Sequence, residues 1–442
     1  MTDQRRDTRR AAAAAVLRSP GMARLALVRF AGQFGDGMFQ AALSGAILFN
    51  PERATDPLAI AGGFIVLLLP YSVIGPYAGA LLDRWDRRTV LLVANVARAV
   101  LIAITAAGLL GGMTDTPLLL LALAVVGISR FVLAGVSAAL PQVVAQRWLV
   151  PMNSVLATAA SACAGLGAAT SVAIIGAIGS GDIASAVAVA VSASGSVIGA
   201  VAAAGFGARI LGPEPGEGAP TSSLRAIMTG LRTGARAVWD SRECTTAMIG
   251  IGVHRIVFGA NTLLMVLVLR RTSGSGVSLS SGLVGFGVAI TAVASGMLAA
   301  AVIAPLLIPR LGRPRTVVAG LLTAIVVELA LVTPITIATG AAEGRAHHLL
   351  LVGAFLLGLA GQTIKLTGDA TMQIDIDDSR RGQVFALQDT VFNITFVLAI
   401  AVTALVIPID GRSLGVVLAG AVIYGVGIAA IAANTRRRTI TR

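Results

Sequence analysis

Polar and charged side chains form two stripes within segments that are otherwise apolar. The members of the first stripe lie 4, 7 and 11 residues after its first residue: Arg29, Gln33, Asp36 and Gln40. The members of the second lie 3, 7 and 11 residues after its first residue: Gln362, Lys365, Asp369 and Gln373. Both spacings place the side chains on one face of an α-helix. Such faces can bind polar groups or protons along a water-filled path.

Seven further side chains extend this pattern into other apolar segments: Arg98, Arg130, His254, Arg255, Asn261, Glu328 and Asp389, with Asn393 one turn after Asp389. A charge at mid-bilayer costs roughly 2.5–3.5 kcal/mol on insertion scales, so it normally faces a cavity or a partner. Nine intramembrane charges are hard to explain in a purely structural bundle. A substrate cavity explains them, although Lys365 and Asp369 can also form a local ion pair.

Asp36 is the side chain that we expect to bind and release a proton. It is the one acid in the first half of the chain that lies on a polar face near the middle of an apolar segment. Arg29 lies two turns away on that face, and Arg130 of another helix can approach it. Desolvation favours the neutral form of a carboxyl group and a nearby Arg favours the charged form, so a moving Arg would switch proton affinity. The alternative is a fixed Asp36–Arg ion pair that only holds the half together. Asp389 is the corresponding candidate of the second half.

The elements that carry these residues are predicted to be transmembrane helices. The chain has 442 residues, 56% of them apolar and 12% charged, with a mean hydropathy of +0.86. A helical span needs about 20 residues. Apolar runs predict twelve spans, at about 22–49, 57–82, 89–112, 116–141, 150–178, 183–211, 243–269, 282–309, 316–340, 346–372, 383–409 and 412–433.

The distribution of basic residues predicts the orientation and the domain boundaries. The termini and even-numbered gaps hold 24 Arg, whereas the odd-numbered gaps hold five, which places both termini in the cytoplasm. The interval 212–242 contains three Pro and then an amphipathic stretch, which predicts a linker and a helix on the membrane surface. The expected parts are a tail (1–21), a six-span half (22–211), a linker (212–242), a second half (243–433) and a tail (434–442).

Other classes of protein are disfavoured by what the sequence contains. Basic residues lie in short segments between apolar runs and aromatics make up only 4%, which argues against nucleic-acid binding. The sequence has neither a Walker loop nor an HExxH or paired-Cys zinc spacing, so we expect no enzyme activity, no cofactor and no metal. Asp375, Asp377 and Asp378 are interpreted as a solvated charged loop.

The segment 79–88 is similar to motif A of the major facilitator superfamily, which has a Gly, then Asp-Arg, then Gly-Arg-Arg between spans 2 and 3. A related basic sequence follows span 8, at 310–317. The resemblance implies two six-helix halves, a cavity lined by spans 1, 4, 7 and 10, and outer positions for the spans of Arg98 and Glu328, which favour structural pairing over transport for these two residues. It also implies a cytoplasmic latch, for which the matching residues are Gly79, Asp83, Arg84, Arg87 and Arg88. The bland alternative is that these Arg only satisfy the positive-inside rule.

Within the superfamily, the Asp-Arg-Trp-Asp-Arg-Arg form looks most like the macrolide, multidrug and siderophore exporters. Asp86 stands where the general motif has its second Gly, and span 5 lacks the Pro of the antiporter motif. The expected function is proton-coupled export of amphipathic or lipophilic small molecules by a monomer in the cell membrane. The alternatives are a dedicated exporter or flippase of a lipid, siderophore or envelope precursor, and a non-transporting receptor or scaffold.

Overall fold

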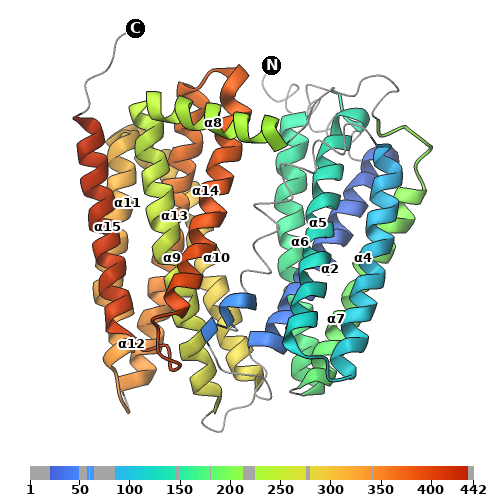
Figure 1. The fold of residues 1–442 in the computed structure, drawn as a ribbon, viewed down its shortest axis with the longest axis horizontal. Coiled ribbons are helices and arrows are strands. Elements are labelled where there is room, and N and C mark those ends of the chain that lie inside the picture. Colours follow the sequence, from blue (N-terminus) through green and yellow to red (C-terminus); the bar gives the residue numbers. More distant parts are fainter. Residues whose placement is uncertain are drawn as a thin grey trace, which may run out of the picture. The chain divides into compact units, whose positions relative to one another are not determined.

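A computed structural model describes residues 20–48, 57–58, 60–63, 85–145, 149–179, 181–212, 224–274, 279–340 and 342–436. Within these ranges all regular secondary structure is helical, and Figure 1 labels the helices. The elements are α2 (Pro20–Leu48), α4 (Arg87–Leu110), α5 (Asp115–Val143), α6 (Leu149–Ile178), α7 (Asp182–Ala204), α8 (Leu224–Asp240), α9 (Arg242–Gly274), α10 (Leu279–Leu311), α11 (Arg313–Val327), η2 (Glu328–Val332), α12 (Thr333–Ile337), α13 (Ala342–Asp375), α14 (Asp378–Ala404) and α15 (Leu414–Thr435).

Ten helical segments of the described chain are long and apolar enough to cross a membrane, so the protein is a multi-pass membrane protein. The predicted span 57–82 lies largely outside the described residues. Helix α2 has 29 residues but is not among the ten, because the polar stripe that includes Gln33, Asp36 and Gln40 lowers its hydropathy. The prediction of twelve spans is therefore matched for ten of them.

The helices cluster into two compact units, which we call the N-terminal unit (α2, α4, α5, α6 and α7) and the C-terminal unit (α8 to α15). In the N-terminal unit, α2 packs against α5, α6 and α7, and α4 packs against α5 and α7. The backbones of α2 and α6 touch: a Cβ on Gly37 would overlap the carbonyl of Ala164, and one on Gly167 would overlap that of Phe34. Small residues permit this approach where apolar burial gives no driving force.

In the C-terminal unit, α13 packs against α10, α11 and α9, and α14 packs against α9. The amphipathic helix α8 lies across one end of this unit and contacts α14 and α9 (Figure 1). The span that begins with α11 is interrupted by the five-residue π-helix η2, which starts at Glu328. Short π-helical segments occur frequently at functional sites.

Candidate functional site

The carboxylate of Asp36 is the centre of a buried polar network in the N-terminal unit. Its side chain is almost fully buried, and it forms an ion pair with Arg98 of α4, with 3.4 Å between Oδ1 and Nη2. Ser129 of α5 donates a hydrogen bond to Oδ1 at 2.6 Å, and Gln33 donates to Oδ2 at 2.9 Å. Asp36 thereby ties together three helices.

Arg98 is held in place by the backbone of α2 as well as by the carboxylate. Its side chain is 1% exposed, and Nη2 donates to the carbonyl of Gly32 at 3.1 Å. A side chain at Gly35 would collide with the carbonyl of Ser192 and crowd the Arg98 guanidinium. The glycines of α2 therefore leave the space in which a buried guanidinium can reach Asp36.

Arg130, which we expected to approach Asp36 across the cavity, is the neighbour in sequence of Ser129. Adjacent helical residues point about 100° apart, so Ser129 contacts the carboxylate while Arg130 interacts with it electrostatically and forms no ion pair with it within 4 Å. The structure thus shows an Asp36–Arg ion pair, but its partner is Arg98 of span 3. Ser129 was not recognised from the sequence, because a serine among small apolar residues gives no signal.

The remaining members of the first stripe do not join this network. Arg29 is partly exposed, and its Nε and Nη1 are buried without a hydrogen-bond partner in the described residues. Gln40 is partly exposed, and its side chain forms no hydrogen bond with the described residues. Only Gln33 and Asp36 of this stripe are brought together.

At the start of α4, the described part of the motif segment binds the ends of neighbouring helices. Asp86 caps α4 by accepting from the backbone N–H of Arg88 and from the Thr89 hydroxyl at 2.7 Å. Arg87 donates to the carbonyls of Ala138 and Leu211, and Arg88 donates to that of Ala204 at the end of α7. Cations at helix C-termini are favourable. Gly79, Asp83 and Arg84 lie outside the described residues.

The second stripe lies on α13 and meets α14. Lys365 and Asp369 form the local ion pair at 2.9 Å, and Gln388 donates to the other oxygen of Asp369 at 2.7 Å. Asp389 is exposed and interacts electrostatically with both members of that pair, while its backbone carbonyl accepts from Asn393. Gln362 is partly exposed on the same helix.

Two residues predicted to line the cavity are hydrogen-bonded to other helices of the C-terminal unit. His254 is 5% exposed, shares a 3.2 Å hydrogen bond with Tyr424 and fits against Gly361 of α13. Asn261, two helical turns later, donates a short hydrogen bond to the fully buried Glu328. The second oxygen of Glu328, Oε2, has no hydrogen-bond partner in the described residues.

Arg255 points toward α14, because it follows His254 and therefore faces about 100° away from it. The guanidinium carbon lies 3.8 Å from the ring centroid of Phe392, 4.2 Å from that of Phe396 and 5.5 Å from that of Phe258. Its Nε donates to the carbonyl of Phe392 at 3.1 Å. Cation–π contacts of this kind stabilise a guanidinium among apolar side chains.

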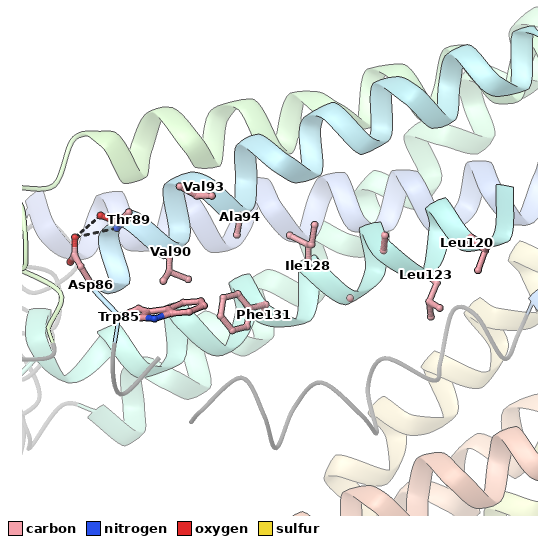
Figure 2. A pocket seen from close by; sticks show the side chains of 12 residues that line it. Trp85, Asp86, Thr89, Val90, Val93, Ala94, Leu120, Leu123, Ile128 and Phe131 are labelled. Atoms are coloured by element: carbon pink, nitrogen blue, oxygen red, sulfur yellow. Dashed lines mark hydrogen bonds between the residues drawn. The ribbon is translucent and has the colours of Figure 1, made fainter. Parts of the chain in front are cut away.

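A groove of about 1090 Å³ lies between α4 and α5 (Figure 2). Its walls are mainly apolar, with Trp85 and Phe131 toward the end where α4 begins. Among the described residues that line it, the one acidic side chain is that of Asp86, which caps α4. No residue of either polar stripe is among the described residues that line this groove.

The described residues contain no group of three His, Cys, Asp or Glu that could hold a metal ion. Asp375, one of the three acids near the end of α13, pairs with Arg313 at 2.8 Å. Arg313 also forms an ion pair with Glu243 at the start of α9. This is an ordinary charge cluster.

Solved structures define the class of fold. The crystal structure of the nucleoside transporter NupG has a TM-score of 0.66 against this chain and is 15% identical in sequence. The match covers 95% of this chain and all of that one. A POT family transporter solved with a thioalcohol-conjugated peptide has a TM-score of 0.63 and is 14% identical in sequence. That match covers 94% of this chain and 97% of that one. The chain therefore has the fold of multi-pass helical transporters.

Sequence relatives give the family, although no protein-family model matches the chain. Uncharacterized MFS-type transporters of Mycobacterium tuberculosis and Mycobacterium bovis are each 42% identical over 411 residues, covering 92% of this chain and 90% of theirs. The protein belongs to the MFS-type transporters, that is, to the major facilitator superfamily.

Proposed function

We propose that this transporter is a proton-coupled exporter of amphipathic or lipophilic small molecules that works by alternating access between its two six-helix halves. We further propose that it is a monomer of the cell membrane with both termini in the cytoplasm. The observation that carries the proposal is the Asp36 network, in which a buried carboxylate on α2 is bound by groups from two other helices.

The network supports proton coupling because its energy depends on the charge of Asp36. With Asp36 ionised, Arg98 has a counter-ion and Ser129 makes a short charge-assisted hydrogen bond. A proton on Asp36 would remove the counter-ion and leave a buried guanidinium without compensation, which is strongly unfavourable. Protonation would therefore favour a second conformation, in which α4 and α5 make other contacts with α2. Coupling requires this dependence of the conformation on the protonation of Asp36.

The substrate class is supported by the apolar character of the chain. Only 12% of the residues are charged, and the 4% of aromatics leave few rings for stacking on a sugar. The alternative substrates, a single lipid, siderophore or envelope precursor, would bind to the same apolar surfaces. Survival of a deletion strain on a range of drugs, measured beside its lipid and siderophore profiles, distinguishes a broad exporter from a dedicated one.

Coupling is tested with purified protein in liposomes and the neutral fluorescent amphiphile N-phenyl-1-naphthylamine. We expect Asp36→Asn to exchange the probe across the membrane without a gradient but to lose uptake driven by an imposed pH gradient. Asp377→Asn, which removes an exposed carboxylate at the start of α14, serves as the matched control and should behave as wild type. Normal gradient-driven uptake by Asp36→Asn would contradict the proposal and would make Asp389 or Asp369 the next acid to test.

The motif segment is proposed to act as a cytoplasmic latch that stabilises one conformation. The contacts of Arg87 and Arg88 with the ends of α5 and α7 support this role, because they bind the loop to two further helices. Asp83→Asn should slow transport of the same probe while membrane insertion stays normal. An equal effect from Asp377→Asn would reduce the segment to a generic charged loop.

A further inference from the structure

The guanidinium of Arg255 is an intramembrane cation that lacks a counter-ion within the described residues. Arg255 lies near the middle of the apolar span Arg242–Leu269, far from either of its ends. No Asp or Glu of the described chain is within ion-pair distance of it. Asp389 precedes Phe392 by one turn of α14, but it interacts with Lys365 and Asp369.

The orientation of Arg255 leaves two donors for a ligand. Its Nε is bound to the carbonyl of Phe392, and the rings of Phe392 and Phe396 lie close to the guanidinium carbon. The terminal nitrogens Nη1 and Nη2 make no hydrogen bond with the described residues, and they are not among the buried nitrogens without a partner, unlike Nε and Nη1 of Arg29. A guanidinium fixed in this way presents a planar fork that matches the two oxygens of a carboxylate, sulfonate or phosphate.

We infer that Arg255 binds the anionic group of the transported molecule, so that the substrates include amphiphiles with a negative charge. This inference rests on the proposed function and narrows its substrate class. The aromatic rings hold the cation ready in the empty protein, and the anion completes its coordination. The apolar surface of the surrounding helices contacts the remainder of the ligand.

Two fluorescent probes that differ in one charged group test the inference. 8-Anilinonaphthalene-1-sulfonate is an anion, and N-phenyl-1-naphthylamine has the same aromatic body without the sulfonate. Binding is measured to protein in nanodiscs of phosphatidylcholine, with empty nanodiscs subtracted. We expect wild type to bind the sulfonate more tightly than the neutral probe. Arg255→Met should lower the affinity for the sulfonate at least about tenfold, as expected for the loss of one charge-assisted hydrogen bond. Its affinity for the neutral probe should change little.

Two variants control for charge and for folding. Arg255→Lys keeps the positive charge without the planar fork, and it should retain part of the preference. Arg236→Met removes the same charge from an exposed position on α8 of the same unit and should bind both probes as wild type does. If Arg255→Met does not fold, the wild-type preference and its reduction in Arg255→Lys decide the question.

An absent preference for the sulfonate in wild type, or a preference that persists unchanged in Arg255→Met, would overturn the inference. Adding phosphatidylglycerol to the nanodiscs identifies the source of the anion: competition that requires Arg255 indicates a lipid, and its absence indicates a soluble amphiphile. Because this experiment measures binding, its result does not depend on proton coupling. A protein that binds the anion but lacks gradient-driven transport is therefore distinguishable from one that transports with a gradient but does not prefer the anion.

Discussion

Removing either member of the Asp36–Arg98 pair should destabilise the protein by several kcal/mol. Both side chains are buried, at 6% and 1% exposure for the residues, so neither charge can be compensated by water. Breaking a buried pair from one side typically costs about 3–5 kcal/mol. Arg98→Met leaves Asp36 with the Ser129 and Gln33 donors, so its cost should lie near the lower value. Asp36→Asn leaves the Arg98 guanidinium with neutral acceptors only, among them the Gly32 carbonyl, and should lie near the upper value.

A double-mutant cycle isolates the interaction from these separate costs. The double variant should be more stable than the sum of the single effects predicts, by about 2 kcal/mol, because it no longer contains an uncompensated buried charge. The free energy of unfolding is measured by titration with sodium dodecyl sulfate, followed by far-ultraviolet circular dichroism. The partly exposed pair Lys365–Asp369 gives the matched control, for which a coupling of only about 0.3–0.5 kcal/mol is expected. Equal coupling for the two pairs would refute the view that the Asp36 network is a buried unit whose energy depends on charge.

Three further predictions follow from packing, satisfaction of buried polar groups and topology. Gly37→Ala should lower the free energy of unfolding by about 1–3 kcal/mol or more, because the methyl group cannot fit against α6; unchanged stability would contradict the observed α2–α6 contact. Glu328→Ala should cost about 1–3 kcal/mol by leaving the Asn261 amide unpaired, whereas Glu328→Gln retains an acceptor and should cost less; the order of the two melting temperatures checks this. In a cysteine-free background, a cysteine replacing Met228 on α8 should be protected from impermeant thiol reagents in intact cells, and one replacing Gly344 should be labelled; the reverse pattern would overturn the orientation.

Periodicity within one segment allowed part of the Asp36 site to be predicted. The stripe of α2 places Gln33 and Asp36 on the same face, and the structure shows them hydrogen-bonded. Periodicity does not reveal which neighbouring helix packs against that face. The choice between Arg98 and Arg130 depends on helix packing and on the rotation of α5, which directs Ser129 to the carboxylate. Neither is encoded in a spacing.

The C-terminal unit illustrates the same limit. The i,i+4 spacing correctly predicted the Lys365–Asp369 ion pair as one of two alternatives. His254 and Asn261 lie seven residues apart, as a cavity-lining face would require, but both are hydrogen-bonded to residues of other helices, Tyr424 and Glu328. A periodic polar face therefore predicts that partners exist without telling whether they are water, substrate or other helices.

For the fold, hydropathy located the ten spans found among the described residues because each contains a long apolar window. It could not predict the π-helical interruption at Glu328, which depends on backbone hydrogen bonding within a continuous apolar segment. The motif residues Gly79, Asp83 and Arg84 lie outside the described chain, so their proposed role still rests on the sequence and on the Arg87 and Arg88 contacts.

Movement of protons during transport tests the central claim most directly. Liposomes containing the protein and the trapped pH indicator pyranine are given N-phenyl-1-naphthylamine on one side only, with the membrane potential clamped and no initial pH gradient. Proton-coupled export exchanges substrate for protons, so wild type should make the lumen more alkaline as the probe enters it and more acidic as the probe leaves. Asp36→Asn should exchange the probe with no change in lumenal pH. Transport of the probe by wild type without proton movement would contradict the account.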